Sequence, residues 1–423
     1  MKRPLRLPSL LALGVNGIVG VGIFFAPREV ASVLPGWGGI WAYAIVTILL
    51  LPTGLVFARL GRAFPEDGGP YLYARAAFGA RAAFAVGWIT YVSALFSTAA
   101  VLVGLVDSTA ESLGAASSPA RLPVEIVLLT VLMGTLSRGL RLSAVMWTAV
   151  TVLKALPLVA LPIAALFALR GSEVSAVSGH AAPGGRMLVA ALPVLFALQG
   201  FEVVPLPGAQ VEEPARNVPL ATVGSLLFAG ALYVALHASC LAALPDLASH
   251  ELPLADAAGV FGGATLRTIV VGATSLSAFG VVVGMLAMTP RYLAPLGSDD
   301  ALGFRLNEQS ARAVPLRAFV VTYAVLLVML AANAVWGSIG HLLALASLSV
   351  TLQYGVTAAA LFALASREER GLSRRDRWSA PFVLLSCALF LFGASALEIP
   401  VVLGMLALGI VARALRPAPG VAM

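Results

Sequence analysis

One lysine and two interruptions marked by glycine are the features of this sequence that can do chemistry. Lys154 lies in the apolar sequence VTVLKALP. Gly20 and Gly22 interrupt a second apolar run in the sequence GVGIF, and Gln199 and Glu202 interrupt a third in the sequence QGFE. An ammonium group in apolar surroundings must bind oxygen atoms or give up its proton. A backbone that unwinds in such surroundings leaves N–H and C=O groups free to bind a charged ligand.

The composition indicates that these residues belong to a membrane protein. The chain has 423 residues, of which 60% are hydrophobic and 11% are charged. Soluble domains average about 45–50% apolar and about 25% charged residues. A water-soluble enzyme, a nucleic-acid-binding protein and a disordered scaffold are therefore disfavoured. Cys240 and Cys387 both lie in apolar runs, where they make no disulfide framework.

The apolar runs have the length of membrane-spanning helices, which need roughly 20 residues each. They are apolar on all sides and lack the period of two that barrel strands show. We predict an all-α membrane protein that forms a single transmembrane domain over residues 1–423. The twelve expected spans are 9–34, 38–61, 82–114, 122–137, 143–169, 187–210, 219–244, 264–295, 316–335, 338–365, 379–396 and 398–415.

The distribution of Lys and Arg predicts the orientation. If the N-terminus is cytoplasmic and twelve spans alternate, most of the 27 Lys and Arg residues fall in cytoplasmic segments. The outer segments hold only Arg28, Arg121, Arg170, Arg186 and Arg267. The positive-inside rule describes this asymmetry. We therefore predict a multi-pass protein of the cell membrane with both termini in the cytoplasm. The net charge of +7 then reflects orientation and contact with the lipid bilayer, and no nucleic-acid partner is expected.

The two interruptions fall in the middle of the first and the sixth expected spans. The first contains Gly14, Gly17, Gly20 and Gly22, and the sixth contains the QGFE sequence. These spans begin two successive sets of five, and paired interrupted segments in corresponding positions indicate a transport site. The alternative for each glycine group is close packing of helices through small residues.

The chemistry of two unwound spans suits a zwitterion. N–H groups at the start of a half-helix bind anions, so a substrate carboxylate is expected near Gly20 and Gly22. Exposed carbonyls near Phe196, Ala197 and Gln199 would bind a substrate ammonium group. An α-amino acid carries both charges and is therefore the expected substrate. The candidate substrate-binding residues are Gly20, Val21, Gly22, Ile23, Phe196, Ala197, Gln199, Gly200, Phe201 and Glu202.

These motifs resemble those of the amino acid–polyamine–organocation (APC) permeases. The segment 20–24 resembles the G-x-G-I-F string of helix 1 in that family, and 196–202 resembles the F-x-x-x-G-F-E stretch of its helix 6. The segment 212–219, EEPARNVP, resembles the loop that follows. The resemblance extends from about Leu10 to Arg370. Val21 stands where many members carry Ser or Thr, so a hydroxyl contact to the carboxylate is lost.

The resemblance implies a LeuT-type fold with 5+5 inverted repeats and discontinuous helices 1 and 6. The repeats would be residues 9–170 and 187–365, followed by two additional helices in 379–416. It also implies secondary transport of amino acids across the membrane by alternating access.

Lys154 lies near the middle of the fifth expected span. A central lysine costs roughly 2.5–3.5 kcal/mol on insertion scales and usually faces the interior of a bundle. The alternative is that its amine reaches a membrane interface. Arg141 and Arg170 mark the two interfaces, and they lie 13 and 16 residues from Lys154. At about 1.5 Å per residue both are roughly 20 Å or more away along a helix, which is beyond the reach of a lysine.

The resemblance also implies a role for Lys154. Some APC members carry a lysine in helix 5 where sodium-coupled relatives of the fold bind Na⁺. Lys154 is similar to that lysine, which implies sodium-independent transport coupled to protons that the amine binds and releases. The alternative is an exchanger of amino acids or polyamines in which Lys154 is a fixed structural cation.

Other polar residues in the spans have several interpretations. Glu202 can cap an exposed half-helix, act in a gate or titrate, and we favour capping. Phe196 and Phe201 either close over the substrate or pack in the core. His237 is expected to be a satisfied polar contact and not a proton relay. Apart from Glu202 the expected cavity walls carry no acidic residue, which favours a neutral or modestly polar amino acid.

Rival functions lack their motifs. The four histidines are too far apart in sequence to form a metal or catalytic pair on one helix. GVG lacks the third glycine of a dinucleotide fingerprint, and no phosphate-binding loop of an ATPase is present. The sequence also has no loop like a channel filter. We therefore predict a transporter that is not an enzyme and uses no cofactor or metal.

Overall fold

The computed structural model describes most of the chain as helix. The described residues are 5–20, 22–64, 69–112, 120–138, 144–169, 184–205, 211–298, 302, 305–310, 314–336, 339–394 and 397–414. The α-helices are α1 (Leu7–Ile18), α2 (Gly22–Val33), α3 (Gly38–Ala63), α4 (Gly69–Phe78), α5 (Ala80–Ser112), α6 (Arg121–Ser137), α7 (Ala144–Ala168), α8 (Gly184–Leu198), α9 (Pro214–Ala243), α10 (Pro253–Ser298), α11 (Leu316–Trp336), α12 (Ile339–Ser366), α13 (Ser379–Phe392) and α14 (Glu398–Ala414). Short 3-10 helices are η1 (Phe201–Val203), η3 (Leu247–Ser249), η4 (Glu369–Gly371) and η5 (Asp376–Trp378).

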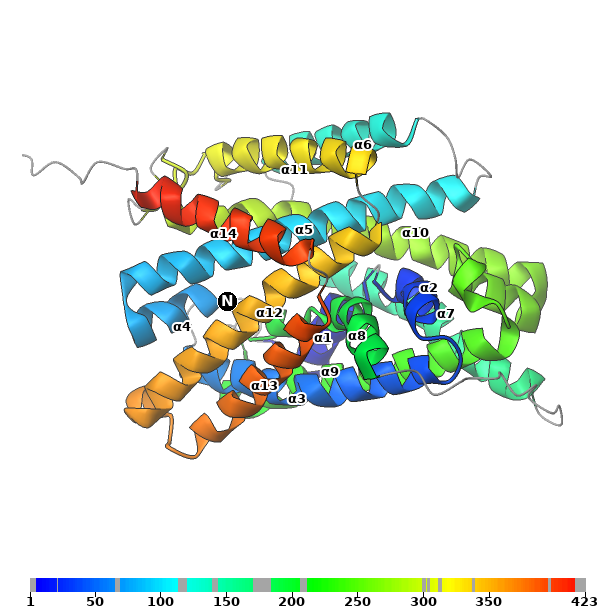
Figure 1. Cartoon of the computed structure of the whole chain (residues 1–423), viewed down its shortest axis with the longest axis horizontal. Helices are drawn as coiled ribbons and strands as arrows, with labels where there is room; N and C mark the ends of the chain where they lie inside the picture. Colours follow the sequence, from blue (N-terminus) through cyan, green and yellow to red (C-terminus); the bar gives the residue numbers. More distant parts are fainter. Residues whose placement is uncertain are drawn as a thin grey trace, which may run out of the picture.

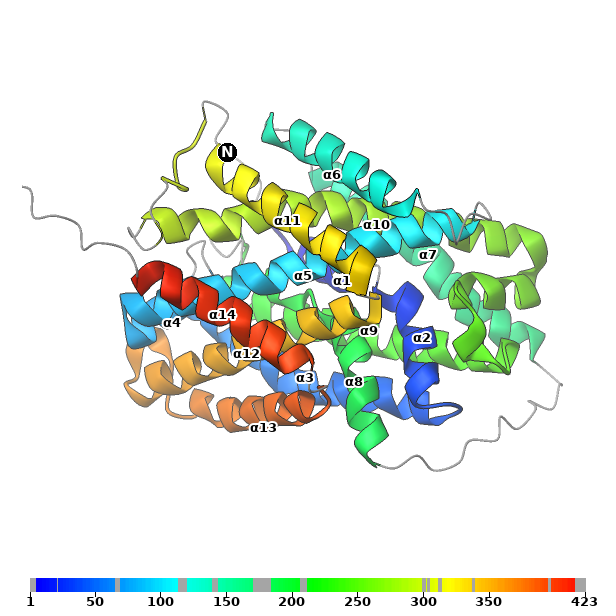
Figure 2. The ribbon, with the colours of Figure 1, turned by 45° about the horizontal axis from the view of Figure 1, so that its top comes forward.

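The helices form one bundle, with most of the long ones running along its longest axis (Figure 1). In both ribbon views α1 lies in the interior, and α6 and α11 lie side by side at one edge (Figure 2). A continuous core of aliphatic and aromatic side chains fills the space between the helices. Many large apolar side chains are instead exposed on the outside. A bilayer can cover such a surface.

The expected spans agree with the observed helices in their positions along the chain, but only partly in their lengths. Each of the twelve expected ranges contains a helix. Seven helices of the described chain are long and apolar enough to cross a membrane, and the bent pair α1–α2 makes an eighth. The helices α6, α13 and α14 have 17, 14 and 17 residues, fewer than the roughly 20 that a span needs. The all-helical, multi-span architecture is therefore confirmed, and the number of twelve spans stays a prediction.

Two helical segments were absent from the expected spans. One is α4, which follows α3. The other is the first part of α10, which is separated from the rest by Gly263 at φ 65°. Only glycine adopts a positive φ at no steric cost, so the chain turns there. The expected span 264–295 begins directly after this turn.

Ion pairs lie at two opposite ends of the bundle, which α3 connects. At the Arg59 end, Arg59 Nε lies 3.2 Å from Asp376 Oδ1. At the Arg28 end, the side chain of Arg28 from α2 pairs with Glu251, which precedes α10. We name the two ends of the molecule after these arginines.

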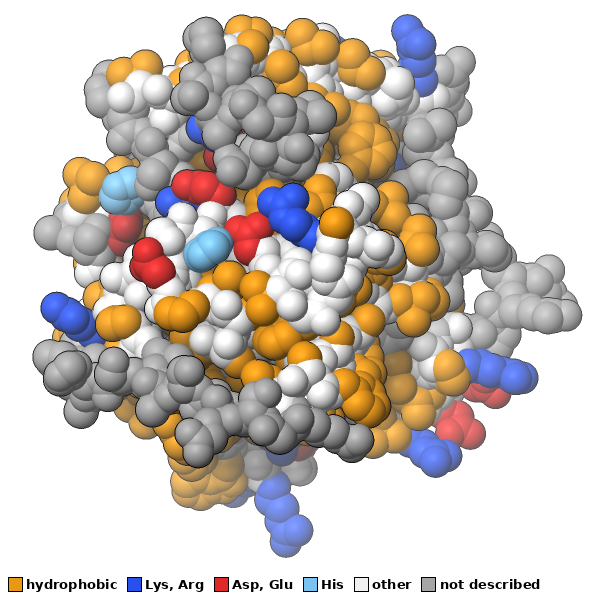
Figure 3. Space-filling view, turned by 90° about the vertical axis from the view of Figure 1, so that its right-hand side faces the viewer, with side chains coloured by type: hydrophobic (Ala, Val, Ile, Leu, Met, Phe, Trp, Pro, Cys, Tyr) orange, Lys and Arg blue, Asp and Glu red, His pale blue; other side chains and the backbone are white. Residues whose placement is uncertain are grey.

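The Arg28 end carries a compact group of charged and histidine side chains. His250 Nδ1 lies 2.9 Å from Asp256 Oδ2, and Arg267 Nη2 lies 3.1 Å from Asp256 Oδ1. Figure 3 shows this end of the molecule, where acidic, basic and histidine side chains gather near the middle of the face. The charges at this end are thus paired with one another.

The start of the described chain is tied to the segment that follows η1. Leu5 forms a parallel bridge with Val211, and the N–H of Glu212 donates to the Leu5 carbonyl at 2.9 Å. Arg6 Nε lies 3.1 Å from Glu212 Oε2. These contacts hold the residues before α1 at the Arg59 end.

Candidate functional site

The first expected interruption separates α1 from α2. Helix α1 ends at Ile18, α2 begins at Gly22, and their axes differ by 46°. The Gly20 N–H donates to the Ile18 carbonyl at 2.7 Å, and Val21 lies outside the described residues. The N–H groups at the start of α2, from Gly22 and Ile23, have no preceding helical turn to bind. N–H groups in such a position can bind an anion.

The second expected interruption follows α8. Helix α8 ends at Leu198, and Gly200 has φ 115°, in the left-handed region that favours glycine. The Gln199 N–H donates to the carbonyls of Leu195 and Phe196 at 3.1 and 3.3 Å. The carbonyls of Ala197 and Leu198 come last in α8, where a helix has no following N–H groups for them.

The two breaks touch each other through their backbones. A Cβ atom on Gly200 would lie 2.1 Å from the carbonyl oxygen of Gly17, and one on Gly17 would lie 2.6 Å from that of Gly200. A Cβ atom on Gly22 would lie 2.8 Å from Ala197 Cα. Only glycine allows contacts this close. The glycines therefore agree with both interpretations of these segments. They allow the helices to be interrupted, and they also allow the helices to pack closely.

Lys154 binds the end of α1. Its Nζ donates to the carbonyl of Asn16 at 3.1 Å and to that of Val19 at 2.5 Å, and the residue is 1% exposed. The C-terminal end of a helix carries partial negative charge, which suits an ammonium group. The alternative in which the amine reaches a membrane interface is wrong, because the side chain points into the bundle from α7.

Glu202 caps the second break. Its Oε2 accepts a hydrogen bond from the Gly200 N–H at 2.9 Å and another from the Tyr354 hydroxyl of α12 at 3.2 Å. A free N–H group at a helix break is thus satisfied by a carboxylate two residues further along the chain. These contacts agree with the capping interpretation.

The two phenylalanines of the second break have different surroundings. Phe201 is fully buried, and its ring centroid lies 6.1 Å from that of Phe57 and 5.7 Å from that of Tyr354. Phe196 packs instead against Gly22 at the start of α2. Phe196 thus bridges the two breaks, and Phe201 belongs to an aromatic cluster with Phe57 of α3 and Tyr354 of α12.

The sequence interpretation missed two tyrosines that hold the breaks. Tyr233 of α9 donates its hydroxyl to the Ile18 carbonyl at 3.0 Å, and Tyr354 binds Glu202. Both are fully buried. A tyrosine hydroxyl in a long apolar run needs a hydrogen-bond partner. The two tyrosines could therefore have been singled out from the sequence by their position in such runs.

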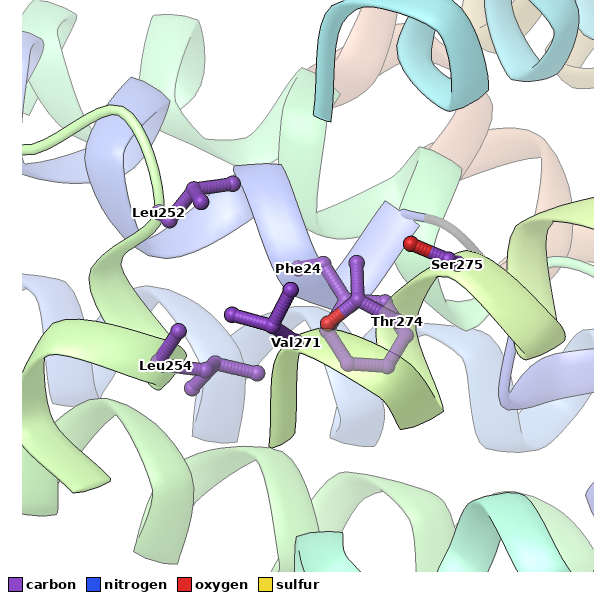
Figure 4. A pocket seen from close by; sticks show the side chains of 7 residues that line it. Phe24, Leu252, Leu254, Val271, Thr274 and Ser275 are labelled. Carbon is purple, nitrogen blue, oxygen red and sulfur yellow. The ribbon is translucent and has the colours of Figure 1, made fainter. Parts of the chain in front are cut away.

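A small cavity lies beside α2. Its volume is about 10 Å³, which is roughly the space that one water molecule needs. Figure 4 shows Phe24 of α2 among residues of α10 and of the segment before it. The lining is uncharged, and its residues are Phe24, Leu252, Leu254, Ala255, Val271, Thr274 and Ser275.

Comparison with known proteins agrees with this architecture. Residues 5–407 match the model of the amino acid permease family. An uncharacterized transporter of Mycobacterium tuberculosis strain H37Rv is 28% identical over 410 residues, which cover 88% of this chain and 82% of the relative. An uncharacterized transporter of Mycobacterium bovis is 25% identical over 421 residues, which cover 98% of this chain and 92% of the relative. The chain belongs to the amino acid permease family of the APC superfamily and is a multi-pass membrane transporter.

Proposed function

We propose that this permease is a secondary active transporter that moves amino acids across the cell membrane by alternating access. The observation that carries the proposal is the contact between the two breaks at Gly17 and Gly200, with Lys154 bound to the carbonyls beside the first break. The N-terminal end of α2 and the C-terminal end of α8 also lie close together, at Gly22 and Ala197, and the dipoles of these two helix ends have opposite sign. A zwitterion is the ligand that such a pair binds best.

The architecture we propose for this function is the LeuT-type bundle. Residues 9–170 and 187–365 form two inverted repeats in it, each beginning with a broken helix, and 379–416 add two helices. Both termini are cytoplasmic, so the Arg59 end faces the cytoplasm and the Arg28 end faces outward. The breaks α1–α2 and α8–η1 in corresponding positions support this arrangement.

The substrate carboxylate binds the N–H groups at the start of α2, from Gly22 and Ile23, with Gly20 and Val21 at its edge. The substrate ammonium group binds the last carbonyls of α8, near Phe196, Ala197 and Gln199. Gly200, Phe201 and Glu202 hold that end in place. Apart from Glu202 the candidate residues of the two breaks carry no acidic side chain, which favours a substrate with a neutral or modestly polar side chain.

Lys154 couples transport to protons in this proposal and makes it independent of sodium. As an ammonium group it neutralises the carbonyls of Asn16 and Val19, to which it is bound. When it releases a proton to water, the amine is a weaker partner of those carbonyls, and α1 is freer to move. Rebinding of a proton restores the contact.

A second candidate function is exchange of amino acids or polyamines with Lys154 as a fixed cation. The observation that favours it is that Lys154 uses its hydrogen bonds on backbone carbonyls and is almost fully buried. A cation in that position stabilises the broken helix whether or not it titrates.

Uptake into proteoliposomes tests both functions. Purified protein is given a panel of labelled amino acids while Na⁺, H⁺ and counter-substrate gradients are imposed separately. Proton-coupled transport predicts uptake driven by a pH gradient alone, and exchange predicts uptake driven only by internal substrate. Failure of every amino acid in all three conditions would contradict both candidates.

A further inference from the structure

Three buried aromatic side chains with polar atoms lie between α3 and α9, away from the contact of the two breaks. Tyr43 comes from α3, and Tyr233 and His237 come from α9; all three are 0% exposed. The ring centroid of Tyr43 lies 6.3 Å from that of Tyr233 and 5.1 Å from that of His237. The two helices pack along each other in the bundle (Figure 1). The three rings therefore form one connected group.

The polar atoms of this group are unequally paired. The Tyr233 hydroxyl binds the Ile18 carbonyl. Within the part of the chain that the structure describes, the Tyr43 hydroxyl and both ring nitrogens of His237 have no hydrogen-bond partner. Buried polar atoms in folded proteins are nearly always paired with protein or with water. A neutral imidazole and a phenol each offer a donor and an acceptor, and His237 thus has a ring nitrogen to which a proton can add.

Gly39 fixes the position of the imidazole. A Cβ atom at this position would lie 2.1 Å from His237 Nε2 and 2.9 Å from Cε1. The absence of a side chain thus lets the ring reach the backbone of α3 near its start. The site is built from both helices, and any larger residue at position 39 displaces the histidine.

The surroundings of His237 contain no close counter-ion among the described residues. The titratable groups beside it are Tyr43 from α3 and Tyr233 and Cys240 from its own helix. Of the other elements that pack against α9, α1 brings no titratable side chain and α7 brings only Lys154. The charged groups of η1, α2 and α8, which also contact α9, are Glu202, Arg28, Glu29 and Arg186. From α10 the nearest acidic group is Asp256, which binds His250 and Arg267. An imidazolium ion in the closed packing is therefore uncompensated.

His237 also lies between the first break and the Arg28 end. Tyr233, one helical turn earlier, binds the carbonyl of Ile18 at the break. After His237, α9 ends at Ala243 and the chain leads through η3 to Glu251 at the Arg28 end. A change in the charge of His237 in response to the pH at the Arg28 end could therefore affect the packing beside the first break.

We propose that Tyr43 and His237 form a second proton-binding site, in which His237 takes up a proton from water on the side that the Arg28 end faces. The proton adds to a ring nitrogen, and no other bond changes. The charged ring loosens the contact of α3 with α9 beside the first break. The site goes beyond the function proposed for Lys154, since it requires neither that residue nor a substrate.

Thermal unfolding of the purified full-length protein as a function of pH tests this site. The unfolded chain binds a proton on His237 below about pH 6.5, the ordinary pKa of histidine, so the stability that depends on His237 falls as the pH drops through that value. This fall levels off at lower pH only if the folded protein also takes up the proton, and a fall that continues undiminished to about pH 4 would overturn the proposal. His237→Gln keeps polar atoms in the site but does not titrate. We expect its loss of Tm between pH 7.5 and 5.5 to be smaller than that of the wild type by about 2–4 °C.

Other variants separate the possible outcomes. Gly39→Ala pushes the ring out of place and should also reduce the acid-dependent loss. His341→Gln removes a half-exposed histidine near Glu398 and should leave that loss unchanged. In a Lys154→Ala background, His237→Gln should still reduce the acid-dependent loss of Tm. This result does not depend on whether amino acid transport is coupled to protons. If His237→Gln and Gly39→Ala both show the acid-dependent loss of the wild type, His237 contributes nothing to that loss and the proposal is overturned.

Discussion

The two broken helices are stabilised in opposite ways. At the first break the carbonyls of Asn16 and Val19 bind a cation, Lys154, which comes from α7. At the second break the N–H of Gly200 binds an anion, Glu202, which lies two residues away on the same segment. In both cases the charge matches the dipole that the break exposes.

The difference lies in where the partner comes from. Lys154 is separated from Asn16 by 138 residues, so this contact depends on the relative positions of α7 and α1. The Glu202 contact with Gly200 is local to its own break, although the same carboxylate also binds Tyr354 of α12. We therefore expect the first break to take part in a conformational change more readily than the second.

The largest effect is expected where the two breaks meet. Gly200→Ala places a Cβ atom against the Gly17 carbonyl and forces a residue with a side chain to a φ of 115°. We expect a loss of about 2–5 kcal/mol in folding stability, seen as low yield and a lower Tm in detergent. Gly404→Ala is the matched control, because a Cβ atom there meets nothing within 4 Å. Equal behaviour of the two variants would refute the close contact of the breaks.

Removal of the remote cation comes next. In Lys154→Met a side chain of similar length replaces the ammonium group, and the Asn16 and Val19 carbonyls lose their charged donor. We expect uptake driven by a pH gradient to fall at least about tenfold, which corresponds to roughly 1.4 kcal/mol. The measurement is initial uptake in proteoliposomes, with protein incorporation as the control. Undiminished uptake would remove Lys154 from both proposed roles.

Removal of the local charge should have a smaller effect than removal of the remote one. Glu202→Gln keeps an oxygen that accepts from the Gly200 N–H and from the Tyr354 hydroxyl. We expect uptake to change by less than about threefold and Tm to stay nearly constant. Glu202→Ala leaves both donors unpaired, at a cost of about 1–3 kcal/mol. A proton-coupling role for Glu202 would instead make the Gln variant as inactive as the Ala variant.

The tyrosines that bind the breaks allow a finer comparison. Tyr233→Phe removes one neutral hydrogen bond to the Ile18 carbonyl, and Tyr354→Phe removes one to Glu202. Each should lower stability by about 1 kcal/mol, measured by thermal unfolding. If the first break is the mobile one, Tyr233→Phe alters the uptake rate and Tyr354→Phe does not. The reverse result would exchange the roles of the two breaks.

The smallest effect is expected at Asp376, which lies far from both breaks at the Arg59 end. Partial burial tends to raise the pKa of its carboxyl group, but hydrogen bonds from Ser373 and the charges of Arg59 and Arg62 outweigh burial and hold the pKa below its usual value. The folded state thus favours the ionised form. The resulting stability is present at neutral pH and is lost as the pH falls through the lowered pKa. In Asp376→Asn, Tm should depend less on pH below about pH 4 than it does in the wild type. The uptake rate at neutral pH should stay the same.

Local features of the fold were predictable from the sequence, and contacts between distant helices were not. Glycine and polar residues within apolar runs located both breaks, and an unpaired charge singled out Lys154. Which carbonyls Lys154 binds depends on the rotation of α7 and its crossing with α1, which no local pattern encodes. The same limit explains the missed contacts of Tyr233 and Tyr354.

Two expectations about polar residues show this limit clearly. Glu202 was expected to cap a break, and its contacts agree because the cap is local in sequence. His237 was expected to be a satisfied polar contact, and this was wrong for the described residues, among which neither ring nitrogen has a partner. Its surroundings are set by Gly39 and Tyr43, which lie on another helix almost two hundred residues earlier.

The bridge between Leu5 and Val211 has a practical consequence for handling the protein. Because Leu5 and Arg6 pack against the segment that follows the second break, an affinity tag fused directly to the first residues would compete with that contact. A tag placed after α14 avoids this interference.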